Sequence, residues 1–185
     1  MTRTELRTAL ALAAVFFMRM LGLFMVVPVM GRYVREFEGA SPQLIGLALG
    51  IYGLTQASLQ IPFGLWSDRI GRKPVITTGL LIFVAGSALA ALAAASSQIW
   101  GVIAGRAVQG AGAVSGATLA LAADLTRPEQ RTKSMAVIGI CIGLAFSVAF
   151  VVGPILDARV GLAGVFIASG TLGLAALGLL WALVP

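Results

Sequence analysis

The segment GLWSDRIGRKP, residues 64–74, places four charged side chains close together in an otherwise apolar sequence: Asp68, Arg69, Arg72 and Lys73. The chain has 185 residues, of which 59% are hydrophobic and 11% charged, and its mean hydropathy is +0.99. A soluble domain of this size cannot bury so much apolar surface. We therefore expect a protein of the lipid bilayer, in which this segment connects two membrane spans.

Six apolar segments lie between the polar connections, and each is near the roughly 20 residues that a helix needs to cross a hydrocarbon core. We expect helices at residues 9–33, 43–66, 75–95, 99–122, 134–156 and 163–184. The first segment is too long for a cleaved signal peptide, since its apolar pattern continues past Arg19 to Met30. The predicted fold class is an all-α membrane protein, in which residues 1–185 form one bundle of six transmembrane helices.

Lys and Arg are distributed unevenly among the expected connections. Eight of them lie at the N-terminus and in the second-to-third and fourth-to-fifth connections, whereas three lie in the connections on the other side. Basic residues accumulate in the cytoplasmic loops of membrane proteins. We therefore expect a multi-pass protein with both termini in the cytoplasm.

The composition argues against several classes of function. The formal net charge of +6 comes from short basic clusters between apolar blocks, so we expect no nucleic-acid partner. The sequence has no histidine and a single cysteine, Cys141. Without histidine there is no Ser-His or Cys-His catalysis, and the usual zinc sites are also missing. We expect neither an enzyme nor a metal site.

A weak internal repeat relates the two halves of the chain. GLWSD at residues 64–68 and GPILD at residues 153–157 share a Gly-x-x-x-Asp spacing at the ends of the second and fifth expected helices. Arg19 and Arg106 lie inside the first and fourth helices. Three helices followed by three matching helices are inserted with opposite topology, as in many transporters. The repeat therefore predicts a 3+3 inverted-repeat bundle.

Three motifs carry a resemblance to a known family. Residues 64–74 resemble the signature between helices two and three of the major facilitator superfamily, and residues 106–113, RAVQGAGA, resemble its fourth-helix motif. Gly153 and Pro154 resemble the fifth-helix motif of its drug:proton antiporters. The resemblance implies the N-terminal half of a twelve-helix transporter, closest to bacterial proton-linked efflux proteins of the inner membrane.

The same resemblance implies how such a protein works. It would transport a small molecule by alternating access, with a proton gradient rather than a cofactor as the energy source. Its partners would be the lipid bilayer and either a C-terminal six-helix half or a second copy of the chain.

The connection at residues 64–74 is expected to be a tight turn of about eight residues, because glycine permits close backbone approach and unusual dihedral angles. Gly64 and Gly71 would allow the turn, and Pro74 would start the next helix. Asp68 would accept hydrogen bonds from the free N–H groups of that helix. Arg72 would then be free to reach Asp124 at the cytoplasmic end of the fourth helix.

The family resemblance gives this turn a role as a conformational latch that holds the outward-facing state against the other bundle. The latch residues would be Gly64, Asp68, Arg69, Gly71, Arg72, Lys73 and Asp124. The alternative is that the basic residues only anchor the loop on the cytoplasmic side.

Arg19 and Arg106 are the only charged residues deep inside the expected helices. Cations at such depth are costly and usually mark a substrate or ion path. By resemblance, Arg106 would take part in proton transfer or its coupling. The expected path residues are Arg19, Arg106, Gln109, Tyr52, Gln56 and Gln60, of which the last three share one face of the second helix because they recur every four residues. Alternatively, all of these side chains only tie helices together.

Two functions from different classes remain open at this point. One is half of a secondary transporter, and the other is a non-transporting membrane scaffold or partner-binding module. The deep arginines and the latch-like turn favour transport, because a scaffold needs neither.

Overall fold

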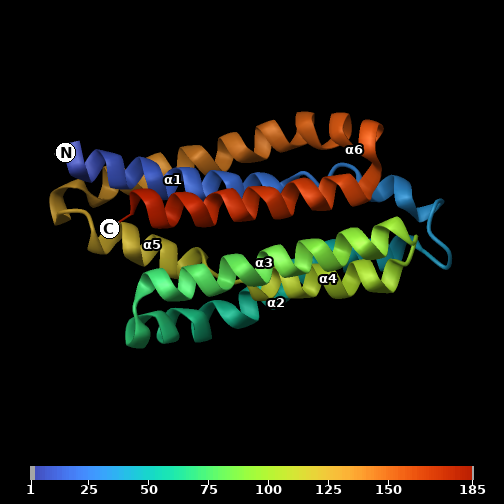
Figure 1. Cartoon of the computed structure of the whole chain (residues 1–185), viewed down its shortest axis with the longest axis horizontal. Helices are drawn as coiled ribbons and strands as arrows, with labels where there is room; N and C mark the ends of the chain where they lie inside the picture. The colour runs from blue at the N-terminus through green and yellow to red at the C-terminus, as the bar shows by residue number, and fades with distance from the viewer. Residues whose placement is uncertain (1–2, 185) are drawn as a thin grey trace.

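The computed structural model describes residues 3–184, and these fold almost entirely as helices (Figure 1). The helices of the first half are α1 (Arg3–Phe24), the 3-10 helix η1 (Met30–Val34), α2 (Pro42–Ile70) and α3 (Arg72–Ala95). Those of the second half are α4 (Ile99–Ala111), α5 (Ser115–Asp124), the 3-10 helix η2 (Pro128–Gln130) and α6 (Arg131–Leu183). The all-helical class predicted from the sequence is confirmed for the described residues.

The first helix ends earlier than predicted. α1 stops at Phe24, and the chain continues as turns to η1 instead of as a helix to residue 33. Pro28 explains the change, since proline has no N–H group to donate to the helical ladder. The turns are held by short-range bonds such as that from the N–H of Met30 to the carbonyl of Val26, at 3.1 Å. The segment leads into η1, which contributes Arg32 and Tyr33 to a polar cluster with Asp157.

The connection between α2 and α3 is shorter than the predicted eight residues. α2 runs on to Ile70 and α3 begins at Arg72, so Gly71 alone separates them. Gly71 has φ 99°, which a residue with a Cβ adopts only under strain. The left-handed backbone at one glycine therefore replaces the longer loop. As a result Asp68 and Arg69 lie in the last turn of α2, and Gly71 occupies the position before α3 where Asp68 was expected to act as the cap.

The fourth predicted helix, residues 99–122, is divided into α4 and α5 by Gly112–Val114. Gly112 has φ −72° and ψ 54°, and its carbonyl accepts a hydrogen bond from Arg19 at 3.0 Å. Unwound backbone at membrane depth is tolerated where protein groups satisfy it. The break therefore leaves the Gly112 carbonyl free to accept a hydrogen bond from the buried Arg19 side chain.

The fifth and sixth predicted helices are the two arms of α6. Gly161 has φ 67° and ψ −178°, and in Figure 1 the chain reverses there and returns alongside α1. Four stretches are long and apolar enough to cross a membrane: 6–24, 42–70, 72–95 and 128–183. The last of them contains both arms of α6, and α4 and α5 are not among them. The six-helix 3+3 arrangement therefore remains a prediction.

Close packing of α3 on α4 fixes the centre of the bundle. A Cβ at Gly105 would lie 2.6 Å from the backbone nitrogen of Ala90, so only glycine allows this approach. α1 packs mainly on α6, where Ser169 donates a hydrogen bond to the carbonyl of Gly22 at 2.6 Å. The interior arginines of α1 and α4 approach one another through α2, where both contact Tyr52.

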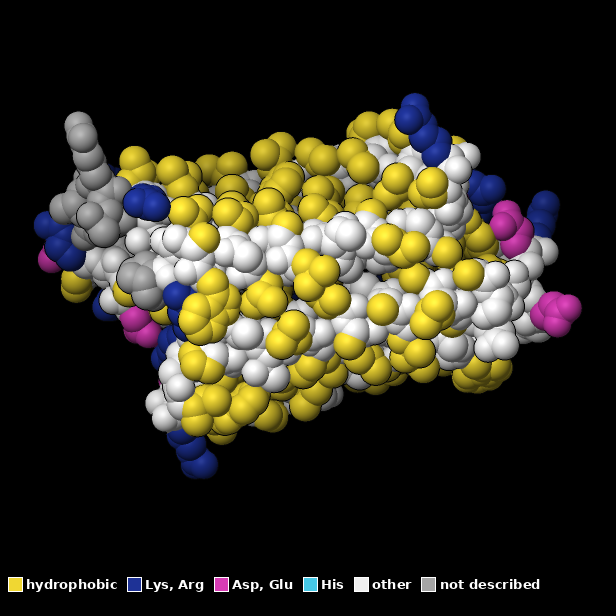
Figure 2. Space-filling view, viewed as in Figure 1, with side chains coloured by type: hydrophobic (Ala, Val, Ile, Leu, Met, Phe, Trp, Pro, Cys, Tyr) yellow, Lys and Arg dark blue, Asp and Glu magenta, His cyan; other side chains and the backbone are white. Residues whose placement is uncertain are grey.

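The distribution of charged and hydrophobic side chains differs between the ends and the middle of the bundle surface. On the face shown in Figure 2, charged side chains gather at the two ends and hydrophobic side chains cover the length between them. Figure 1 places both described termini at the same end of the bundle. This is the pattern of a membrane protein with an apolar band between polar rims.

Candidate functional site

A charge cluster occupies the end of the bundle where α2 turns into α3. We call it the α2–α3 charge cluster: Ser67, Asp68, Arg72 and Asp124. Arg72 Nη1 lies 2.5 Å from Asp68 Oδ1 and donates to Ser67 Oγ at 2.6 Å, while Arg72 Nε donates to Asp124 Oδ2 at 3.3 Å. The predicted contact of Arg72 with Asp124 is therefore confirmed, through one bond rather than a bidentate pair.

The exposure of this cluster is its main property. The side chains of Asp68 and Asp124 are 55% and 56% exposed, and that of Arg72 is 24% exposed. Ser67 is buried and donates to the carbonyl of Gly64 at 2.7 Å. Ser67 was not among the predicted site residues, although its place directly before Asp68 was a signal. Exposed ion pairs contribute little net free energy, so these contacts can form and break readily.

The other two basic residues of the turn lie outside the cluster. Arg69 is exposed. Lys73 donates to the carbonyl of Val184 at 2.6 Å and lies 4.6 Å from the centroid of the Trp181 ring. Lys73 therefore ties the start of α3 to the end of α6.

A buried arginine network lies deeper in the bundle. It consists of Arg19, Tyr52, Gln56, Arg106 and Gln109, with Ser87, Ser115 and the Gly112 carbonyl as further partners. Arg19 and Arg106 are each 1% exposed. Arg19 Nη2 donates to the hydroxyl of Tyr52 at 3.0 Å and to Gln56 Oε1 at 3.3 Å. Its Nη1 donates to Ser115 Oγ at 3.1 Å.

Arg106 contacts the ring of Tyr52 and has hydrogen-bond partners of its own. Its Nε donates to the carbonyl of Ala48 at 3.3 Å, and its Nη1 donates to Gln109 Oε1 at 3.0 Å. Gln109 in turn donates to Ser87 Oγ at 2.7 Å. The guanidinium carbon of Arg106 lies 4.8 Å from the centroid of the Tyr52 ring. Tyr52 thus contacts both arginines, one with its hydroxyl and one with its ring.

Five of the six predicted path residues meet in this network, and Gln60 does not. Gln60 faces α5, where a Cβ at Gly116 would lie 3.3 Å from its Nε2, and its buried Oε1 has no hydrogen-bond partner among the described residues. The four-residue spacing places Gln60 on the same face of α2 as Tyr52, but about two helical turns separate the two residues along the helix axis.

The network contains no acidic side chain. The seven acidic residues of the sequence are Glu5, Glu36, Glu38, Asp68, Asp124, Glu129 and Asp157. In the part of the chain whose side chains are described, none of these carboxylates forms a salt bridge with Arg19 or Arg106. Arg19 and Arg106 are therefore solvated by neutral oxygens and an aromatic ring.

An open hollow of about 440 Å³ adjoins the network between α1, α2, α4 and α6. Its apolar walls include Met20, Leu23, Phe24, Leu49 and Ile142. Its polar lining is Tyr52, Gln56 and Arg106. We call it the Arg106 hollow.

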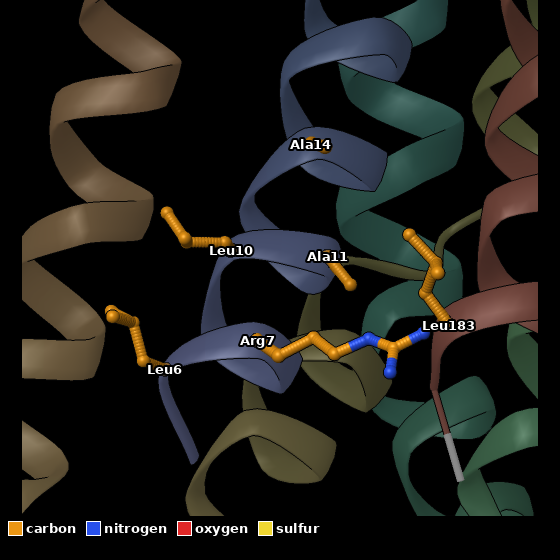
Figure 3. Close-up of a pocket in the computed structure, with 6 residues that line it drawn as sticks. All are labelled: Leu6, Arg7, Leu10, Ala11, Ala14 and Leu183. Atoms are coloured by element: carbon orange, nitrogen blue, oxygen red, sulfur yellow. The ribbon is translucent and has the colours of Figure 1, made fainter. Parts of the chain in front are cut away.

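A second hollow, of about 400 Å³, lies at the end of the bundle that holds both termini (Figure 3). It is lined by Leu6, Arg7, Leu10, Ala11, Ala14 and Leu183, and Figure 3 shows the Arg7 side chain reaching toward Leu183. None of the residues that line it belongs to the buried arginine network, and Arg7 is its charged group.

The end of the bundle opposite the α2–α3 turn holds a different charge cluster, which we call the Asp157 cluster: Arg32, Tyr33 and Asp157. Arg32 Nη1 lies 2.6 Å from Asp157 Oδ2, and the hydroxyl of Tyr33 donates to Asp157 Oδ1 at 2.6 Å. The N–H of Leu162, just past the Gly161 reversal, donates to the same hydroxyl at 2.8 Å. The Asp157 side chain is only 1% exposed.

The electrostatics of the Asp157 cluster follow from this geometry. Burial, together with the hydrogen bond to Asp157, raises the pKa of Tyr33 to about 12. The attraction of Asp157, and then that of Glu36, raises the pKa of Arg32 above its usual value. Asp157 was predicted only as part of the repeat, and neither Arg32 nor Tyr33 was among the predicted site residues. Both lie more than a hundred residues from Asp157 along the chain.

The predicted fifth-helix motif lies beside this cluster. Gly153 is buried against the end of α1, where a Cβ would overlap the carbonyl oxygen of Met25. Pro154 lies inside α6 on an exposed face. Gly153 therefore permits the close contact that brings Asp157 to Arg32 and Tyr33.

Comparisons with known proteins agree with this architecture. The model of the Major Facilitator Superfamily matches residues 12–185. The chain is 55% identical over 166 residues to the inner membrane transport protein YajR of Escherichia coli (strain K12), covering 90% of this chain and 36% of that protein. It is 33% identical over 162 residues to the class E tetracycline resistance protein of Escherichia coli, covering 84% of this chain and 37% of that protein.

Among solved structures, a bacterial homolog of the human lysosomal transporter Spinster, crystallised in an inward-facing and unoccupied conformation, matches the fold with a TM-score of 0.83. It is 17% identical, and the match covers 100% of this chain and 44% of that one. The chain thus spans less than half the length of each of these proteins.

Proposed function

Because this chain belongs to the major facilitator superfamily, we propose that it forms the N-terminal half of a proton-coupled secondary transporter of the efflux type that works by alternating access. Relatives named as a transport protein, as tetracycline resistance proteins and as a multidrug resistance protein support this reading. The observation that carries it is the buried arginine network beside the Arg106 hollow. A scaffold has no use for two uncompensated cations in its interior, whereas a transport path does.

The proposed arrangement is a 3+3 inverted repeat. In support of it, each Gly-x-x-x-Asp segment leads into a glycine with positive φ, Gly71 after Asp68 and Gly161 after Asp157. Each aspartate also pairs with an arginine, Arg72 in one case and Arg32 in the other. The two turns lie at opposite ends of the bundle, as an inverted repeat requires (Figure 1).

The α2–α3 charge cluster is the proposed latch. Its carboxylates are more than half exposed, so a second bundle that docks on this end can contact them. The docking partner is a C-terminal six-helix half or a second copy of the chain. Opening and closing the contact changes only exposed ion pairs, which are worth about 0–1 kcal/mol each.

Proton coupling requires a group that gains and loses a proton near the path. The network consists of arginines, glutamines, a tyrosine and serines, and its described side chains include no carboxylate. We therefore assign the titrating carboxylate to the second bundle and give Arg106 the task of coupling to it. This division of labour explains why the interior of this half carries only positive charge.

The orientation is proposed from the bias of Lys and Arg toward one side. Single cysteines at Ser97 and Thr132, in a Cys141→Ala background, test it. An impermeant thiol reagent added outside intact cells should label the cysteine at Ser97 and not the one at Thr132. Labelling of both from outside contradicts the topology.

The functional test uses everted membrane vesicles that contain the longest natural protein in which this chain occurs. The vesicles are acidified by respiration, and a panel of antibiotics and metabolites is added while the internal pH is followed by dye fluorescence. A substrate of a proton antiporter should discharge the gradient, and Arg106→Gln should abolish the response. If the panel leaves the gradient intact while uptake assays detect no flux, the transporter reading is wrong.

A further inference from the structure

We propose that the Arg106 hollow binds an organic anion, an apolar body that carries one carboxylate or similar acidic group. This inference rests on the proposed function, since it names the substrate class of the same path. Its grounds are the charge of the network, the lining of the hollow and the way in which the two arginines are held.

The first ground is the charge balance. Arg19 and Arg106 are both almost completely buried, and both contact Tyr52. In residues 6–184, whose side chains are described, neither guanidinium has a carboxylate partner. Two cations in a region of low dielectric create a strongly positive potential, which attracts an anion and repels a cation.

The second ground is the shape and lining of the hollow. Its volume of about 440 Å³ lies in the range of small-molecule sites. The walls are mainly aliphatic and aromatic, from residues such as Leu23, Phe24 and Leu49, and the charged group is Arg106. An apolar ligand with a single negative charge matches this lining, because its body replaces water against the walls while its charge meets the guanidinium.

The third ground is the difference between the two arginines. Four neutral acceptors take hydrogen bonds from the Nη atoms of Arg19: Ser115, Tyr52, Gln56 and the Gly112 carbonyl. Arg106 donates from Nε to Ala48 and from Nη1 to Gln109, and its side chain also lines the hollow. We therefore assign Arg106 as the residue that contacts the anion and Arg19 as a positioning residue that holds Tyr52 and adds to the potential.

Gln56 and Tyr52 complete the site. Both line the hollow, and both are fixed by Arg19. The amide of Gln56 accepts from Arg19 through its oxygen, which leaves its N–H groups as donors. Donors that are already oriented bind an anion without reorganising.

The test is an equilibrium titration of the purified protein, in its longest natural form and in a mild detergent, with 2-naphthoate and with 2-naphthamide. The two probes have nearly the same shape, and only the first is ionised at neutral pH. Isothermal titration calorimetry should give a dissociation constant for 2-naphthoate at least about tenfold lower, since a charge-assisted contact replaces a neutral one.

Three variants localise the binding. Arg106→Gln should abolish the preference for the carboxylate. Gly53→Leu should block both probes, because Gly53 lines the hollow and a Cβ there meets no other atom within 4 Å, so the larger side chain fills the hollow without disturbing the helix. Gly46→Leu is its matched control on the same helix, since a Cβ at Gly46 is also free of contacts and the residue lies outside the hollow.

Arg7→Gln is the control for charge, because Arg7 lines the second hollow and its removal lowers the net positive charge by the same amount (Figure 3). Retained binding in Gly46→Leu and Arg7→Gln, with loss in Gly53→Leu, supports the proposal even if Arg106→Gln does not fold. Equal affinity for the two probes, or an unchanged preference in Gly53→Leu, overturns it. Equal affinity for the two probes is the result expected if a carboxylate of the second bundle already pairs with Arg106. Arg106 would then not be the residue that binds the anion.

The outcome is independent of transport. The titration needs no gradient, so a protein that binds 2-naphthoate at this site but fails to move protons leaves the anion site standing and refutes only the coupling. A protein that exchanges protons for other compounds but ignores 2-naphthoate refutes the anion site alone.

Discussion

The two ends of the bundle use the same chemistry, an aspartate paired with an arginine and followed within four residues by a glycine of positive φ, but the two aspartates differ in burial. In the α2–α3 charge cluster the Asp68 side chain is 55% exposed, whereas the Asp157 side chain is 1% exposed. An exposed pair is screened by water and worth little, while a buried carboxylate that loses its partner becomes a large penalty. From this difference we expect a switching contact at the proposed latch and a permanent tie at the Asp157 cluster.

Breaking the permanent tie should have the largest effect on stability. Asp157→Ala leaves the buried Tyr33 hydroxyl without its acceptor and also removes the partner of Arg32, whose side chain is 55% exposed. We expect a loss of up to about 3 kcal/mol, the cost of leaving a buried polar group unsatisfied. The thermal unfolding midpoint of the purified protein in mild detergent measures it. Glu36→Gln is the control, since Glu36 pairs with Arg32 at 3.4 Å but is 48% exposed, and it should change the midpoint little.

If Asp157→Ala unfolds no earlier than Glu36→Gln, the Asp157 cluster does not tie η1 to α6. The contrast between the two ends of the bundle would then disappear.

The pH dependence of the same cluster should be smaller. Folding raises the pKa of Tyr33 from 10.0 to about 12, so the native state keeps the proton that the unfolded chain loses first. The stabilisation is complete below pH 10 and is lost as the pH rises toward 12. Thermal unfolding followed from pH 9 to 12 should show this decline, and Tyr33→Phe should flatten it after subtraction of the background from other groups.

Tyr33→Phe should also be less stable than the wild type at neutral pH by about 1–3 kcal/mol, because Asp157 and the N–H of Leu162 lose a buried partner. An identical pH dependence in the variant and the wild type would contradict the role of Tyr33.

The smallest effect on stability is expected at the switching end. Arg72→Lys keeps the charge, but one ammonium cannot reproduce the separate contacts of Nε with Asp124 and of Nη1 with Asp68 and Ser67. We expect the unfolding midpoint to change by less than the equivalent of about 1 kcal/mol, since both carboxylate partners are more than half exposed.

Transport by Arg72→Lys should nevertheless fall in the vesicle assay, and Asp124→Asn should resemble it. Arg69→Gln is the matched control, because Arg69 is exposed and lies outside the α2–α3 charge cluster. Full transport by both cluster variants would reduce the turn to a topological anchor.

The sequence predicted much of the α2–α3 region because its signals are local. Glycine, proline and charge within residues 64–74 predicted a tight reversal. The expected place of Asp124 at the cytoplasmic end of the fourth helix predicted it as the partner of Arg72. The predicted length of the turn and the predicted role of Asp68 as a helix cap were wrong. One glycine in the left-handed region reverses the chain and leaves Asp68 inside α2. A local pattern indicates that a turn exists better than it indicates which dihedral angles make it.

The buried arginine network was predicted in its members but not in its connections. Helical spacing placed Tyr52 and Gln56 on one face of α2, and the apolar surroundings marked Arg19 and Arg106. No pattern predicted that α4 would unwind at Gly112 to supply a carbonyl to Arg19, or that Ser87 and Ser115 would complete the network. These partners come from helices that only packing brings together.

Composition, hydrophobic length and motif spacing, all properties of the chain read in order, were enough to determine the membrane setting, the all-helical class and the family. The helix breaks, the different hydrogen-bond partners of Arg19 and Arg106, and the buried Asp157 cluster were decided only by the tertiary structure. Arg32 and Asp157 are separated by 125 positions, and their pairing depends on Gly153 letting α6 approach the end of α1. A contact of that kind is set by the distance between packed backbones, which a linear sequence does not contain.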